Sequence, residues 1–120
     1  MILAFPSDGK GIENNIDQRF GRCAYFVSYD TDTKGVTFVT NEQNYQAVQG
    51  AGIQSATHVV NMKADVCITT HCGPKAFRVF DTAGVKVITG VSGKISDAIK
   101  KFEHNEFNFA SSADVDGHWV

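Results

Sequence analysis

Two soft metal-binding side chains, His71 and Cys72, stand side by side within the segment Thr69–Lys75. The apolar run Asp65–Thr69 is typical of a short buried strand, and Pro74 suits the first position of a helix, where its missing N–H costs nothing. Ligands of open α/β sheets bind at the carboxyl ends of strands, and the amides of a helix start favour anions. The sequence therefore predicts a metal or anion site at this junction.

A helix start should lower the pKa of the Cys72 thiol, so we expect a thiolate. The side chains of His71 and Cys72 diverge because the two residues are adjacent, and they cannot easily act on each other as base and nucleophile. Metal or anion binding therefore fits better than hydrolysis. Two alternatives stay open: a thiol- or zinc-dependent hydrolase that uses His71 and Cys72, and an adaptor that binds a protein partner and whose cysteines are incidental.

A second candidate group is Gly21, Arg22 and Cys23, at the start of another apolar run. The glycine would let the backbone approach a ligand closely, and the arginine offers a forked hydrogen-bond donor to an anion. A solvated arginine beside a buried thiol is an equally good interpretation. Gly50 and Gly52 stand at the start of a predicted helix. This glycine-rich start is either a second site that favours anions or simply the flexible end of a loop.

The third cysteine and the remaining histidines carry weaker signals. Cys67 lies inside the apolar run at 66–68 and is expected to fill the core. His58, on a predicted helix, and His104, near a helix end, are expected to be structural. His118 belongs to a Gly-His-Trp sequence whose aromatic side chain favours burial, so it is a further candidate ligand.

The cysteine count limits the kind of metal site. The chain has three cysteines, an odd number, and no Cys-x-x-Cys pair. One chain therefore offers neither a disulfide framework nor a four-cysteine zinc or iron–sulfur site. Any cluster must use other ligands, fewer ligands, or a second subunit.

Length and charge exclude other classes of protein. The 120 residues suit one domain, 1–120, that buries roughly two-thirds of its unfolded surface. A formal charge of −2 without a basic cluster argues against nucleic acid and anionic membranes as partners. The apolar runs fall short of the ~20 residues of a membrane span, and the first one is too short for a signal peptide. We therefore expect a cytoplasmic protein.

The apolar periodicity predicts the elements that position these residues. Strands are expected at 2–5, 23–29, 36–40, 65–70 and 85–88, and helices at 50–60, 74–82 and 94–103, with a coil from Asn105 onwards. Three strands of meander followed by αβαβα give an α/β fold, a five-stranded mixed sheet with helices on both faces. This order also suggests the ribonuclease H-like architecture. Nucleases of this architecture bind their metal ions with carboxylates near the ends of strands. Here the soft ligands His71 and Cys72 lie at the end of the fourth strand, which disfavours magnesium chemistry.

Taken together, five blocks of the chain resemble the dinitrogenase iron–molybdenum cofactor biosynthesis family. This NifX-like group includes the C-terminal domain of NifB and the orange-protein type of cluster binder. The resemblance runs nearly end to end and rests on Phe20–Phe26, Gly50–Ile53, His71–Arg78, Ala83–Val87 and Gly117–Trp119. It implies a ribonuclease H-like fold. It also implies a protein related to nitrogen fixation that carries or stores a metal–sulfur cluster and has no catalytic residues.

The resemblance also implies roles for the candidate residues. An anionic cluster, of the iron–sulfur, molybdenum–iron–sulfur or molybdenum–copper–sulfur type, needs compensating charge and hydrogen bonds to sulfide. The residues expected to supply these are Gly21, Arg22, Gly50, Gly52, Gly73 and Lys75. The expected soft metal ligands are Cys23, His71, Cys72 and His118. Cluster donor and acceptor proteins are the expected partners of a monomer or weak homodimer.

Overall fold

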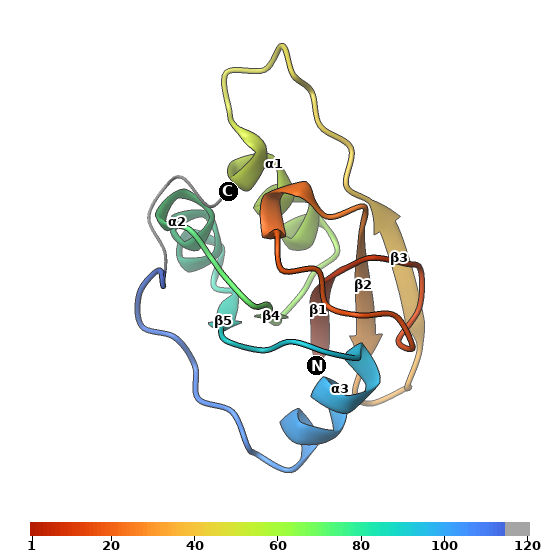
Figure 1. The fold of residues 1–120 in the computed structure, drawn as a ribbon. Helices are drawn as coiled ribbons and strands as arrows, with labels where there is room; N and C mark the ends of the chain where they lie inside the picture. The colour runs from red at the N-terminus through yellow and green to blue at the C-terminus, as the bar shows by residue number, and fades with distance from the viewer. Residues whose placement is uncertain (115–120) are drawn as a thin grey trace.

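The computed structural model describes residues 1–114. In chain order, these residues form β1 (Ile2–Ser7), the 3-10 helix η1 (Phe20–Arg22), β2 (Tyr25–Asp30), β3 (Val36–Thr40), α1 (Ala51–Asn61), β4 (Val66–Ile68), α2 (Pro74–Ala83), β5 (Lys86–Ile88) and α3 (Ile95–Glu103). The five strands build one sheet in the order β3-β2-β1-β4-β5 (Figure 1). The predicted α/β fold with a five-stranded mixed sheet and three helices is confirmed.

The sheet is mixed because its two halves are connected differently. β1 pairs with β2 and β2 with β3 in antiparallel fashion, so the first three strands form the predicted meander. β1 pairs with β4 and β4 with β5 in parallel, which requires crossover helices. The carboxyl ends of β1, β4 and β5 therefore lie at one edge of the sheet, where a ligand site is expected.

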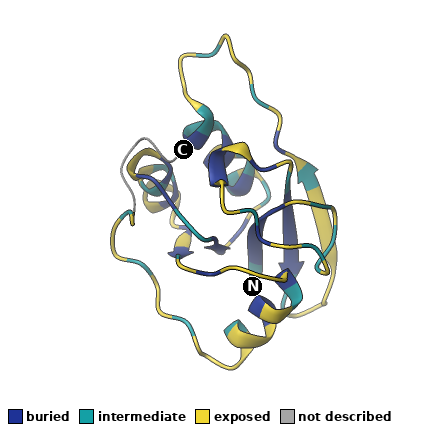
Figure 2. Cartoon of the chain, in the orientation of Figure 1, coloured by how far each residue is buried: buried dark blue, intermediate teal, exposed yellow. Residues whose placement is uncertain are grey.

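The sheet separates two hydrophobic cores. Ala4, Phe26 and Cys67 face the side covered by α1 and α2, whereas the strand residues Leu3 and Phe5 face the side covered by α3. This alternation follows from the period of two along a strand. Figure 1 shows α1 and α2 close together and α3 apart from them. Figure 2 shows that β1 and β2 are mostly buried and that β3 is mostly exposed.

The start of β2, the ends of α2 and the chain after α3 can be compared with the predicted elements. Phe20–Arg22 form η1 instead of leading directly into a strand, so β2 begins at Tyr25 and Cys23 lies before it. α2 has its proline at the first position, as predicted, and ends at Gly84, whose φ of 77° is readily adopted only by glycine. The chain from 105 to 114 is coil, as predicted, and His118 lies outside the described residues.

Within residues 1–114, none of the helices combines the length and the apolarity needed to cross a membrane.

Candidate functional site

The structure gathers one of the two predicted groups around a cavity of about 400 Å³, the η1–α1 pocket. Its lining residues come from η1, from the segments around it, and from the first turn of α1: Arg19, Gly21, Arg22, Cys23, Asn41, Gln43, Tyr45 and Ala51. Gly21, Arg22 and Cys23 are thus placed beside the helix start that Gly50 and Gly52 were predicted to form.

The lining of the η1–α1 pocket suits an anion. Arg19 and Arg22 are both exposed, and Arg19 makes a long ion pair of 3.7 Å with Asp17. The first-turn amides of any α-helix lack an intrahelical acceptor, and the N-cap of α1, Gly50, offers them no side-chain cap. Two guanidinium groups and a helix start at one cavity favour negative charge.

Cys23 forms the buried wall of this pocket, with 3% of its surface exposed. The Asn41 side-chain amide donates to the Cys23 carbonyl at 3.0 Å and approaches its Sγ at 3.6 Å. Burial raises the pKa of the Cys23 thiol to about 12, although hydrogen bonds from the Ser7 amide and Asn41 act in the opposite direction. The thiol is therefore protonated at neutral pH, and it would have to lose its proton to bind a metal.

Asn41 is the centre of a buried polar network that the sequence analysis did not single out. Its Oδ1 accepts from Gln43 Nε2 at 3.0 Å, and Ser55 Oγ lies 3.1 Å from Oδ1 and 3.2 Å from the Gly21 carbonyl. The network ties η1 to α1 and fixes the backbone at Cys23. An asparagine that follows a strand in a polar segment looks like a loop residue, so no sequence signal marks it.

The second predicted group lies at the β4–α2 junction, residues 69–73. Cys72 is fully buried and shares the core of Ala76 and Phe80. Burial, followed by the negative charge of Asp114, raises the pKa of the Cys72 thiol to about 12. The predicted lowered pKa is wrong, because desolvation of a thiolate in an apolar core outweighs the favourable end of a helix dipole. The Sγ contacts the Gly73 carbonyl at 3.7 Å.

The polar groups of the β4–α2 junction face a carboxylate from the end of the described chain. The Cys72 amide donates to Asp114 Oδ1 at 2.7 Å, and His71 Nδ1 lies 3.1 Å from Asp114 Oδ2. The Asp114 amide in turn donates to the Cys72 carbonyl at 3.3 Å. Asp114 was missed because a residue 42 positions further along a polar coil gives no sign of its contact.

The other predicted residues are spread around these two regions. Gly73 is buried as the N-cap of α2, and Cys67 is fully buried in the core, as predicted. Lys75 is exposed and lines a separate groove between α1 and α2, not the η1–α1 pocket. His58 is structural, since its Nε2 bonds to the Glu42 carbonyl at 2.7 Å. Among residues 1–114, no three His, Cys, Asp or Glu side chains are arranged to hold a metal ion.

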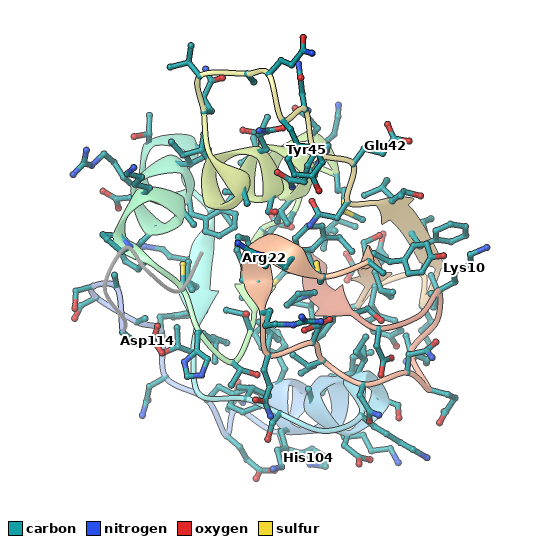
Figure 3. All side chains as sticks on the ribbon, turned by 45° about the horizontal axis from the view of Figure 1, so that its top comes forward. Lys10, Arg22, Glu42, Tyr45, His104 and Asp114 are labelled. Atoms are coloured by element: carbon teal, nitrogen blue, oxygen red, sulfur yellow. The ribbon has the colours of Figure 1, made fainter. Side chains whose placement is uncertain are left out.

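The two regions share a core but open separately. Phe20 of η1 packs against Phe80 of α2 with ring centroids 5.7 Å apart, and the thiols of Cys23 and Cys72 belong to this same core. Figure 3 shows Arg22 near the centre of the view, with Tyr45 above it, and Asp114 well to one side. The candidate residues of these two regions therefore lie at an open pocket and at a junction whose amide and imidazole face a carboxylate. We refer to these regions as the η1–α1 and β4–α2 half-sites of the candidate site.

Comparison with known proteins identifies the relatives of this arrangement. Residues 1–105 match the family described as dinitrogenase iron-molybdenum cofactor. An uncharacterized protein of Methanocaldococcus jannaschii is 30% identical over 105 residues, 85% of each chain. The apo form of the orange protein from Desulfovibrio gigas is 31% identical with a TM-score of 0.88, covering 95% of this chain and 96% of the other.

A Thermotoga protein solved by NMR and provisionally assigned as a NifB protein is 27% identical with a TM-score of 0.79, over 95% of this chain and 97% of the other. The family match covers most of the chain, and the structural likeness extends over nearly all of it. The chain therefore belongs to the dinitrogenase iron–molybdenum cofactor family.

Proposed function

We propose that this protein binds and carries an anionic metal–sulfur cluster as cargo during the assembly of an iron–molybdenum or related cofactor, without catalysing a reaction. The observation that carries the proposal is the η1–α1 pocket, where Arg19, Arg22 and the start of α1 surround a cavity of about 400 Å³ with Cys23 in its wall. Sulfide-bridged clusters are anionic and accept hydrogen bonds, which matches this lining.

Cys23 is the soft ligand best placed to bind the cargo directly. Its thiol is protonated in the folded chain, since its pKa is raised to about 12, so a metal must displace the proton. Binding should therefore release a proton and hold the cluster by few covalent bonds. A carrier needs such a cargo to be exchangeable, whereas a closed four-ligand site would retain it.

The geometry of the β4–α2 junction weighs against the hydrolase alternative. A nucleophilic thiol needs a base within hydrogen-bonding reach and access to a substrate. Cys72 is buried with a raised pKa, and its Sγ contacts the Gly73 carbonyl, while Nδ1 of His71 faces Asp114. His71 and Cys72 would then serve the cargo as a second contact region, with His118 as a further candidate ligand.

Architecture and setting complete the proposal. The order β3-β2-β1-β4-β5 supports assignment to the ribonuclease H-like folds. We infer a cytoplasmic carrier, monomeric or weakly dimeric, that exchanges its cargo with donor and acceptor proteins and has neither nucleic acid nor membrane as partner.

Anaerobic reconstitution tests the proposal. The purified chain is incubated with iron and sulfide, with tetrathiomolybdate, and with tetrathiomolybdate plus copper(I), then desalted and analysed for metal, sulfide and visible absorption. We expect one cluster per chain and a charge-transfer spectrum. A colourless protein with substoichiometric metal in every mixture contradicts the carrier function. In a separate incubation with zinc alone, stoichiometric binding with hydrolytic turnover would favour the enzyme.

A matched pair of variants assigns the site. Cys23→Ser replaces a soft ligand with a hard one and should change the charge-transfer bands. Cys67→Ser alters a thiol of the same core away from the pocket lining and should leave the bands in place. Identical spectra for the wild type and Cys23→Ser would exclude Cys23 as a direct ligand.

A further inference from the structure

The chain after α3 returns to the start of α2 and ends its described course there. It runs as coil along the outside of the molecule, as the blue segment in Figure 1 shows. The Ala110 amide donates to the Val87 carbonyl at 2.7 Å, so one hydrogen bond joins this coil to the edge strand β5. We refer to residues 105–114 as the return segment. Phe107 and Ala110 pack against the two cores, but most residues of the segment are exposed, so it should open at a lower cost than the sheet.

Asp114 binds the β4–α2 junction as an external anion would. One carboxylate oxygen accepts the Cys72 amide at 2.7 Å, and the other lies 3.1 Å from His71 Nδ1. The backbone of Asp114 adds a bond from its amide to the Cys72 carbonyl at 3.3 Å. Both donors precede the N-cap Gly73, where negative charge is favoured. The chain thus supplies its own anion to this half-site.

The same carboxylate is unfavourable for an anionic cargo. Its side chain is 28% exposed, so its charge is only partly screened by solvent. A cluster that contacts His71 and Cys72 would meet Asp114 at the donors it needs. Because the competitor is part of the chain, its effective concentration is high and independent of the cargo.

We propose that Asp114 is a displaceable internal ligand that occupies the Cys72 amide and the His71 ring in the cargo-free protein and gives way when an anionic cargo binds. This inference rests on the proposed function and assigns a regulatory contact to the same site. The return segment closes the β4–α2 half-site, while the η1–α1 half-site stays open for the first encounter. The cargo must therefore bind strongly enough to displace a carboxylate, which selects against weakly binding anions.

The test compares variants at position 114 with a control that changes the net charge equally. Asp114→Asn keeps the size and an acceptor but removes the charge, and Asp114→Ala removes both. Glu103→Gln removes one charge at the end of α3, on the opposite side of the sheet. Each full-length protein is titrated anaerobically with tetrathiomolybdate, and affinity and association rate are read from its visible absorption.

Removing the competing state should raise the apparent affinity. We expect Asp114→Ala and Asp114→Asn to bind the probe about three- to ten-fold more tightly than the wild type, with faster association, whereas Glu103→Gln stays within two-fold. A merely structural Asp114 predicts the opposite sign, because losing its bonds would loosen the site. Equal or weaker binding by both Asp114 variants would overturn the inference while leaving the proposed function intact.

Hydrogen exchange provides a second readout on the wild type. Loading with tetrathiomolybdate should accelerate exchange of the amides at Ala110 and Asp114, since the return segment detaches. Unchanged protection of both amides in the loaded protein would also refute the inference. If neither the wild type nor any variant takes up tetrathiomolybdate, this inference fails, whereas the proposed function is decided by reconstitution in all the mixtures.

Discussion

The η1–α1 pocket and the β4–α2 junction begin from similar sequence features and end in opposite states. Each places a cysteine near a glycine N-cap without a side-chain cap, and each buries the thiol in the same core. The pocket keeps Arg19 and Arg22 at an open cavity of about 400 Å³. The junction instead has its amide and imidazole facing Asp114.

The comparison indicates that a helix start can accept an external anion only where the rest of the chain leaves it accessible. Local dipoles are alike at Gly50 and Gly73, so they cannot distinguish the two regions. Two exposed guanidinium groups lie at one region, and a carboxylate accepts a hydrogen bond from the backbone amide of the other. Burial, in turn, keeps both thiols protonated regardless of the nearby helix.

The largest expected effect concerns the network that shapes the open region. Asn41→Ala removes donors to the carbonyls of Gly21 and Cys23, which lie 3.5 and 3.0 Å from Nδ2. Leaving the buried Cys23 carbonyl without this donor, and Gln43 and Ser55 without the Asn41 acceptor, should lower the free energy of unfolding by about 2–4 kcal/mol, measured by urea denaturation. Gln43→Ala, which truncates a half-buried member of the network, should cost below about 1 kcal/mol. Equal losses would show that Asn41 is no special support of the pocket.

The next largest effect is on cluster retention, compared between an arginine of the pocket and a lysine of the α1–α2 groove. Arg22→Ala removes a charge-assisted donor worth about 1.5–3 kcal/mol, so cluster retention should weaken about ten- to a hundred-fold while the spectrum keeps its shape. Lys75→Ala should change retention less than two-fold, because Lys75 lines the α1–α2 groove. Equilibrium dialysis of reconstituted protein measures both. A larger loss in Lys75→Ala would reverse the ranking of the two regions.

The Cys23 and Cys72 thiols should contribute equally to the loss of folding stability at alkaline pH. Folding raises each pKa from 9.0 to about 12, so the unfolded chain loses the proton first. The stability contributed by each thiol is complete below pH 9 and is lost progressively between pH 9 and 12. Between pH 8 and 10, wild type should lose about 1.4 kcal/mol more than Cys72→Ala in urea unfolding.

Cys23→Ala should show the same difference, because burial is the dominant cause at both positions. Arg22→Ala, which retains every thiol, should lose as much as the wild type over this interval. A pH dependence that is unchanged in both cysteine variants would mean that the thiols ionise in the native state.

The smallest effect tests the uncapped start of α1. A Cβ at Gly50 would meet no atom within 4 Å, and its φ of −78° suits any residue. Gly50→Ser adds a side-chain cap and should raise the free energy of unfolding by a few tenths of a kcal/mol. Gly50→Asp should stabilise the helix similarly but weaken tetrathiomolybdate binding, since it adds negative charge at the pocket. Unchanged probe affinity in Gly50→Asp would place the cargo away from this helix start.

The sequence by itself determined the order and type of the main elements. Periods of two and 3.6 indicated the strands and helices, and Pro74 begins α2 as predicted. It also identified Cys67 as core, because a thiol inside an apolar run fills space like a small hydrophobic residue. Gly21, Arg22 and Cys23 were recognised as one group because they are neighbours in the chain.

Only the tertiary structure decided which of these groups share a surface and what charge surrounds them. The network of Asn41 with Ser55, and the contact of Asp114 with Cys72, join residues 14 and 42 positions apart. The burial of Cys72 likewise depends on packing by Ala76 and Phe80. Because of this burial the pKa of the thiol is raised, whereas the sequence predicted a lowered pKa. Periodicity reports which face of an element is apolar, whereas desolvation and field strength depend on every segment that folds against that face.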